Sequence, residues 1–324
     1  QKIILEAIKA YLDVYSNQSV VRLRKRSLKR FEENVEATKL KLEAGTVTPT
    51  VLAEAQSKYA KAKYELILAE GNLNNYTSKL KSITKLKNVP SDLKLPKLNF
   101  KIPKTVNKAV EVSLENNPII LVAKLEKDIA KKNVDLKKSN NRPSLKMEFF
   151  GKDSQSSVNT SASDYQSYGA NLTFSTPLFY NESTKDNIRR LDKLFIATSF
   201  DLSEKNRQVE LNAISSYQNY KSTLAKTSAS RSEKISSLLA LNGIKKEAQF
   251  GIRTVLDVLD AEVEYLNAST NVIKSKADEI YSQFHIKSIL GNLSIRDINR
   301  DYKVNHDLKE NSLNFKILDP KAFN

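Results

Sequence analysis

An arginine and two aspartates lie close together late in the chain, and their types and spacing suit electrostatic chemistry. Asp257 and Asp260 are three residues apart, a spacing that puts both carboxylates on one face of a helix. Arg253 lies just before them and could form an ion pair with a neighbouring acid. Solvated helix acids would show the same spacing, so the role of these charges depends on the elements that position them.

The charged residues follow a predicted bend between two long helices. Apolar residues recur every three or four positions on both sides of Phe-Gly-Ile-Arg-Thr, which is the helix period. Gly251 can take the left-handed conformation that ends a helix. Thr254 suits the N-cap of the next helix, where its hydroxyl would accept a bond from a free backbone N–H. We therefore expect a tight turn between antiparallel helices, with Arg253 and the aspartates at its tip.

Motifs that would indicate catalysis are missing from the sequence. It contains no nucleophile elbow, no phosphate-binding glycine loop and no His/Asp metal cluster. Cysteine is absent, so disulfides and thiolate metal sites are excluded. The two histidines, His285 and His306, are far apart in sequence and are interpreted as structural. We expect a protein that is not an enzyme and that needs no cofactor or metal.

The composition indicates an elongated helical protein. The 324 residues include only 7 glycines and 8 prolines, which leaves little room for loops. The net charge of +16 could attract nucleic acid, but the lysines alternate with acids along helices instead of forming one patch. No run approaches the roughly 20 apolar residues of a transmembrane helix.

Two long helical hairpins are predicted, one in each half of the chain. Residues 1–44 form one helix; Gly45 ends it, and Pro49 is tolerated at the start of the next. The second helix carries an apolar heptad seam, typical of a coiled coil. The seam comprises Leu52, Ala55, Tyr59, Ala62, Leu66, Ala69, Leu73, Tyr76, Leu80 and Ile83. In the second half, a helix from about 181 to 246 precedes the bend, and another runs to about 290.

A pair of strands separates the hairpins. Residues 145–149 and 168–174 alternate apolar and polar side chains, the period of a strand with one apolar face. Each strand is expected to be about nine to eleven residues long, the length that a tilted strand needs to cross a bilayer. Because an isolated two-stranded ribbon is only marginally stable, these strands must join others.

The chain also matches itself without gaps at an offset of 206 positions. Gly45 aligns with Gly251, Thr48 with Thr254, and Tyr59 with Tyr265. The two bends are therefore equivalent parts of two repeats. The first repeat lacks its strands, and the chain opens with Gln1 inside a helix, so we expect at least ~60 further residues upstream.

Five regions follow from these patterns. They are a first helical hairpin without strands (1–87), a connector with short helices (88–142), a transmembrane β-hairpin (143–180), a second helical hairpin (181–292) and a C-terminal tail (293–324).

This organisation resembles the TolC-like outer-membrane efflux proteins. The resemblance is strongest from Gly251 to Ala261 and in His-Ile-Lys-Ser-Ile-Leu-Gly-Asn-Leu at 285–293, and it covers nearly the whole chain. It implies a mainly α fold with a β-hairpin, in which long coiled-coil hairpins build a periplasmic α-barrel. It also implies a homotrimer that shares one twelve-stranded β-barrel in the outer membrane, since closed barrels satisfy their backbone bonds in lipid.

The resemblance also implies roles for residues at the tips. Asp257 and Asp260 match two rings of acids that narrow the pore, Arg253 and Thr50 match a latch, and Gly45 and Gly251 form the tip turns. Two positions depart from the family pattern. Ala248 replaces an expected tyrosine, and Val51 replaces an expected acid. We therefore expect a latch that is weaker or built differently.

The function implied is that of a passive exit duct in a tripartite efflux or type I secretion system. Its expected partners are a periplasmic adaptor (membrane fusion protein), an inner-membrane pump of the RND or ABC class, and outer-membrane lipid of a Gram-negative bacterium. No nucleic acid is expected. The alternative is a soluble or peripheral coiled-coil scaffold that binds nucleic acid through its +16 charge; the barrel-length strands argue against it.

Overall fold

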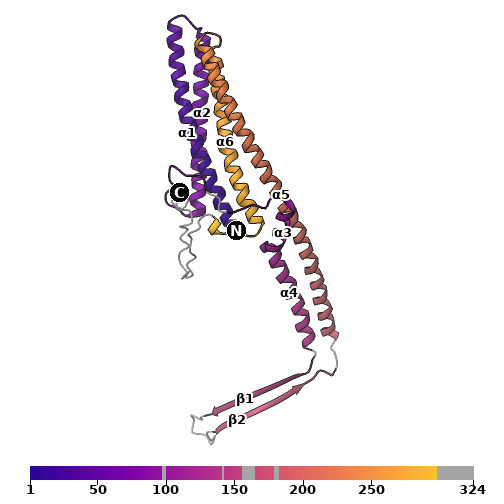
Figure 1. Ribbon diagram of the computed structural model, residues 1–324. Coiled ribbons are helices and arrows are strands. Elements are labelled where there is room, and N and C mark those ends of the chain that lie inside the picture. Colours follow the sequence, from indigo (N-terminus) through magenta and orange to yellow (C-terminus); the bar gives the residue numbers. More distant parts are fainter. Residues whose placement is uncertain (97–99, 141, 155–164, 179–181, 298–324) are drawn as a thin grey trace. The chain divides into compact units, whose positions relative to one another are not determined.

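The computed structural model describes residues 1–96, 100–140, 142–154, 165–178 and 182–297 (Figure 1). The chain divides into two compact units. The first comprises Gln1–Asn117 and the chain from Val209 onward, and the second comprises Pro118–Gln208. None of the described helices is both long enough and apolar enough to span a membrane.

Long helices dominate the first unit. They are α1 (Lys2–Glu43), α2 (Pro49–Thr84), α6 (Val255–Ile289) and the C-terminal part of α5 (Glu182–Gln249), with the shorter α3 (Val106–Asn116) and the 3₁₀ turn η1 (Ile295–Asp297). The bend at 45–48 joins α1 to α2, and the bend at 250–254 joins α5 to α6 (Figure 1). Both predicted hairpins are confirmed, and their ends differ from the predictions by at most a few residues.

The predicted seam of α2 faces the protein interior along most of its length. Ala55, Leu66, Ala69 and Leu80 are buried. Tyr76 is the exception, with 37% of its surface exposed. A straight helix drifts by about 20° per heptad relative to a strict seven-residue repeat. By the last turns the inward face has moved one position, and Thr84 is buried there.

Small polar side chains connect α5 to α6. The hydroxyls of Thr223 and Ser282 are 2.8 Å apart, and Thr227 Oγ1 donates to the Ser275 carbonyl at 3.1 Å. Hydroxyls this small let two helix backbones approach closely while their own polar atoms remain bonded. The second hairpin is therefore joined partly by hydrogen bonds.

The segment after α2 packs against the base of both hairpins. Gln18 accepts a bond from the Leu93 amide at 3.1 Å and donates to the Pro90 carbonyl at 2.7 Å. Leu93 itself is buried in a cluster with Leu12 and Phe284. The first part of the predicted connector, around Leu93, thus belongs to the core of the first unit.

The second unit contains α4 (Pro118–Ser139), the N-terminal part of α5, and an antiparallel hairpin of β1 (Ser144–Ser154) and β2 (Tyr165–Ser175). Cross-strand pairs such as Met147 with Leu172 put the apolar residues on one face, as the alternation predicted. Residues 155–164, between the two strands, lie outside the described residues.

One aromatic residue interrupts the polar face of this hairpin. Phe150 pairs across the strands with Gly169. Its ring covers this glycine so closely that a Cβ added to Gly169 would lie 2.5 Å from Phe150 Cζ. An aromatic ring over a cross-strand glycine covers backbone that the glycine leaves bare. Phe150 therefore stabilises the strand pairing even though the alternation assigns its position to the polar face.

Candidate functional site

The two bends are built in the same way. Gly45 has a φ of +70° and Gly251 a φ of +75°, both in the left-handed region. At the first bend, Thr46 N–H donates to the Lys41 carbonyl at 2.9 Å; at the second, Ile252 N–H donates to the Glu247 carbonyl at 3.0 Å. Each bond closes a Schellman motif and satisfies a carbonyl at the helix end. The predicted turns and their equivalence are confirmed at the level of single hydrogen bonds.

The helices that follow the two bends begin differently. Thr254 caps α6, because its Oγ1 accepts from the Asp257 amide at 3.2 Å while Asp257 Oδ2 accepts from the Thr254 amide at 2.8 Å. This reciprocal pair is a capping box. At the equivalent place in α2, Thr48 makes no side-chain capping bond, and Val51 stands where Asp257 does. The missing acid at Val51 thus has a structural consequence at the first tip.

The capping box sets the charge state of Asp257. Hydrogen bonds from the Thr254 amide and hydroxyl lower the pKa of Asp257 most, and the nearby charge of Arg253 lowers it further. Such bonds favour the ionised form of a carboxyl group. Asp257 is therefore a fixed negative charge at the tip. Its capping role could have been found in the sequence, since Thr-Val-Leu-Asp has capping-box spacing.

Asp260 lies one turn further along α6 and pairs with the other hairpin. Its carboxylate accepts a hydrogen bond from Lys58 Nζ of α2 in a direct ion pair. The Lys58 side chain is 28% exposed and that of Asp260 is 67% exposed. The two predicted pore acids therefore have different surroundings: hydrogen bonds within the turn hold one, and a lysine from α2 faces the other.

The two predicted latch residues are not joined within this chain. Arg253 Nε donates to Glu247 Oε2 at 3.0 Å, which raises the pKa of Arg253 through that bond and the charge of Glu247. Thr50 is exposed in the first turn of α2. In the part of the chain described here, no bond connects Thr50 to Arg253.

A buried acid near the tip forms an ion pair that the sequence did not predict. Glu262 is 4% exposed, and its carboxylate accepts from Lys245 Nζ at 2.6 Å and from Asn34 Nδ2 at 3.4 Å. Three helices, α1, α5 and α6, contribute to this group. No sequence spacing indicates it, because burial of Glu262 depends on how the hairpins pack.

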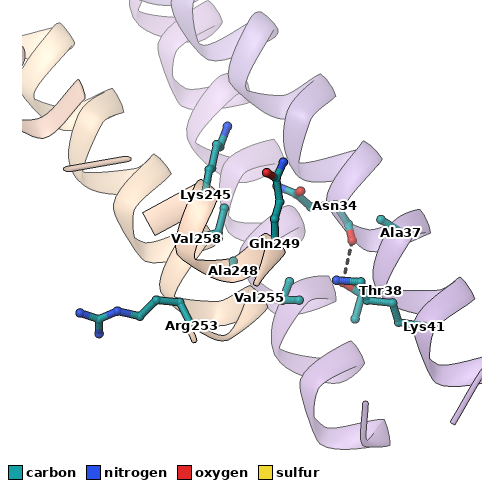
Figure 2. A pocket seen from close by; sticks show the side chains of 10 residues that line it. All are labelled: Asn34, Ala37, Thr38, Lys41, Lys245, Ala248, Gln249, Arg253, Val255 and Val258. Carbon is teal, nitrogen blue, oxygen red and sulfur yellow. Dashed lines mark hydrogen bonds between the residues drawn. The ribbon is translucent and has the colours of Figure 1, made fainter. Parts of the chain in front are cut away.

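A cavity of about 290 Å³ opens beside this ion pair, between the end of α1 and the second bend (Figure 2). Figure 2 shows Arg253 directed away from the other labelled side chains. The lining consists of Asn34, Ala37, Thr38, Lys41, Lys245, Ala248, Gln249, Arg253, Val255 and Val258. Ala248, the position where the family pattern has a tyrosine, therefore borders an open space.

Other titratable groups do not add a site. Burial lowers the pKa of His285, which lies against the Tyr281 ring at 6.0 Å between centroids. His306 lies outside the described residues. Over the described parts of the chain, no group of three or more His, Cys, Asp or Glu side chains could hold a metal ion.

Comparison with known proteins identifies relatives along nearly the whole chain. Outer membrane protein TolC of Vibrio cholerae is 26% identical over 317 residues, covering 94% of this chain and 72% of that protein. Outer membrane protein TolC of Escherichia coli K12 is 24% identical over 312 residues, covering 92% of this chain. The chain spans 63% of the length of the Escherichia coli protein.

Solved structures share the fold. The open state of the Neisseria gonorrhoeae MtrE outer membrane channel superposes with a TM-score of 0.72 at 18% identity, covering 90% of this chain and 66% of that one. At this identity the likeness bears on the fold alone, and it confirms the expected mainly α fold with a strand pair.

Residues 109–292 match the family described as outer membrane efflux protein. This segment includes the strand hairpin, all of α5, the second bend and α6. Proteins of this family are channels and not enzymes, in agreement with the lack of catalytic motifs. This match covers more than half of the 324 residues, and the chain therefore belongs to the outer membrane efflux protein family.

Proposed function

We propose that this protein is the outer-membrane channel of a tripartite efflux or type I secretion system, working as a passive trimeric duct. Its strands would lie in the outer membrane of a Gram-negative bacterium, and its long hairpins would extend into the periplasm. Transport then needs no chemistry in this protein. It needs a water-filled lumen and a periplasmic mouth that opens.

The observation that carries this proposal is the apolar surface left on the outer helices of the first unit. Ile67 of α2 is 59% exposed, and Leu239 of α5 is 67% exposed. Further exposed apolar residues on the same two helices are Tyr64, Leu68, Leu211 and Ile235. Soluble monomers rarely leave such stripes uncovered. A ring of copies in which α2 of one protomer packs on α5 of the next would bury them.

The strand hairpin supports the same proposal. Its apolar face is exposed along the described strands, including Phe149 at 74% and Phe174 at 66%. Two strands alone also leave both outer edges unpaired, which promotes pairing with further strands. Strands from several copies, closed into one barrel, would pair those edges and turn the apolar faces toward lipid.

The bend at 250–254 is proposed as the pore mouth. Asp257 and Asp260, repeated in three copies, would form two rings of carboxylates that favour cations and bind polyvalent cations. Arg253 and Thr50 would contribute to a latch between neighbouring copies. Phe250 and Ile252 are 81% and 71% exposed at this bend, which suits docking of a periplasmic adaptor that couples the duct to an inner-membrane pump.

Single-channel recording in a planar bilayer tests the proposal. The full-length gene product is expected to form cation-preferring channels that divalent cations block, and the Asp257→Ala/Asp260→Ala variant is expected to lose both properties. If this variant keeps the cation preference and the divalent block of the parent, Asp257 and Asp260 do not form the pore rings. Extraction from cells without detergent, together with salt-sensitive DNA binding, would favour a coiled-coil scaffold instead.

A further inference from the structure

The ion pair between Lys58 and Asp260 joins the two hairpins at the tip. Lys58 is in the third turn of α2 and Asp260 in the second turn of α6, 202 positions apart in sequence. Most of the Lys58 side chain is covered, while Asp260 remains largely exposed. Packing between the hairpins therefore holds the lysine in place beside an acid that still faces solvent.

The repeat does not reproduce this pair. At the 206-residue offset, Lys58 aligns with Glu264 and Asp260 aligns with Glu54. The second hairpin thus carries two acids at positions where the first carries an acid and a lysine. The positive charge beside Asp260 is specific to the first hairpin and is not a product of the shared hairpin geometry.

The two acids at the mouth consequently contribute different net charges. Asp257 is bonded to the neutral amide and hydroxyl of Thr254, and the nearby Arg253 is already paired with Glu247. The negative charge of Asp257 therefore remains largely uncompensated. Lys58 compensates the charge of Asp260 at direct contact, where screening by salt is weakest.

We propose that Lys58 determines the ion selectivity of the mouth by neutralising the carboxylate ring at the level of Asp260. This inference rests on the proposed channel function. In a trimer, the ring of Asp257 would then carry the net negative charge, and the ring of Asp260 would be close to neutral. Any movement that separates α2 from α6 would expose three further negative charges to the permeating ions.

Bilayer recordings on four variants of the full-length protein test this role. Lys58→Met removes the charge and keeps the length of the side chain, and Lys58→Arg keeps the charge. Asp260→Asn removes the partner, alone and combined with Lys58→Met. The readouts are the K⁺/Cl⁻ permeability ratio and the concentration of La³⁺ that halves the conductance.

Lys58→Met is expected to raise the permeability ratio and to lower the half-blocking La³⁺ concentration by roughly three- to tenfold, as expected for one weakly screened charge per protomer. Lys58→Arg is expected to behave like the parent protein. In the Asp260→Asn background, Lys58→Met should have no further effect, because the acid that it exposes is gone.

Three results would overturn the inference. The first is an unchanged block in Lys58→Met when Asp257→Ala/Asp260→Ala does change it. The second is an effect of Lys58→Met that persists in the Asp260→Asn background, which would locate its action elsewhere. The third is a larger conductance without a change in selectivity, which would make the pair a mechanical link. Absence of any channel would overturn the proposed function together with this inference.

Discussion

At the residue scale, the two tips differ at one position, the fourth residue of the N-cap motif. The second bend has an acid that accepts bonds from its N-cap threonine, and the first bend has Val51 in that place. An acid in the first turn of a helix also interacts favourably with the helix dipole. The start of α2 therefore lacks two local stabilising interactions that the start of α6 has.

We expect Asp257→Asn to weaken the first turn of α6, and Val51→Asp to strengthen the first turn of α2 by about 0.5 kcal/mol. Because hydrogen bonding lowers the pKa of Asp257 below its ordinary 3.8, its contribution is complete above that pH and is lost as the pH falls through the folded-state pKa. Hydrogen exchange of the two first turns should show both effects at pH 7.

The same measurement at a pH below the folded-state pKa of Asp257 provides the control, because protonation of Asp257 then removes the difference between the parent and Asp257→Asn. Val51→Asn supplies a neutral side chain of similar size to the aspartate. Equal protection in Val51→Asp and Val51→Asn at neutral pH would show that charge has no role at the first tip.

At the element scale, three glycines with positive φ end long helices in different surroundings. Gly45 and Gly251 lie in open space, where an added Cβ would meet no atom within 4 Å. Gly291 follows α6 with a φ of +80°, and a Cβ there would lie 2.2 Å from the Asn116 carbonyl oxygen. The end of α6 is therefore packed against the backbone at the C-terminal end of α3.

This difference predicts a graded response to alanine. Gly45→Ala or Gly251→Ala should cost about 1 kcal/mol, the cost of a left-handed residue with a Cβ. Gly291→Ala should cost about 1–3 kcal/mol more, because a backbone atom must also move. Chemical unfolding in detergent would measure the ranking. Gly243→Ala, inside α5 with no atom within 4 Å of its Cβ, should instead stabilise the protein.

Equal costs at Gly251 and Gly291 would mean that the backbone contact between the end of α6 and the end of α3 shifts easily. If Gly243→Ala destabilises the protein, helix propensity and φ do not explain the order of the unfolding free energies of these variants.

The same scale explains which features the sequence could predict. The helices and strands were predictable because the spacing of their apolar residues is set within a few positions. Both bends were predictable because Gly45 and Gly251 end their helices through local backbone conformation. The burial of Tyr76 was predicted wrongly, because helix drift accumulates over several turns. The pairs of Lys58 with Asp260 and Lys245 with Glu262 could not be predicted, since they depend on packing between segments about 200 positions apart or on burial.

At the scale of the whole molecule, the apolar stripes on α2 and α5 lead to a prediction about assembly. We expect Leu239→Glu to prevent trimer formation, because it would bury an unpaired charge in the proposed contact. Light scattering in detergent would report the mass of the assembly. Leu239→Met keeps the surface apolar and should assemble like the parent; a trimer of Leu239→Glu would exclude this stripe from the contact.

The left-handed residues that close the hairpins are spaced alike. Lys85 lies 40 residues after Gly45, and Gly291 lies 40 residues after Gly251. One added residue turns every later side chain by about 100° about its helix. Evolutionary changes of hairpin length should therefore come in steps of about seven or eleven residues. They should also occur in both repeats together. The length of the helical hairpins would then differ between relatives in discrete steps.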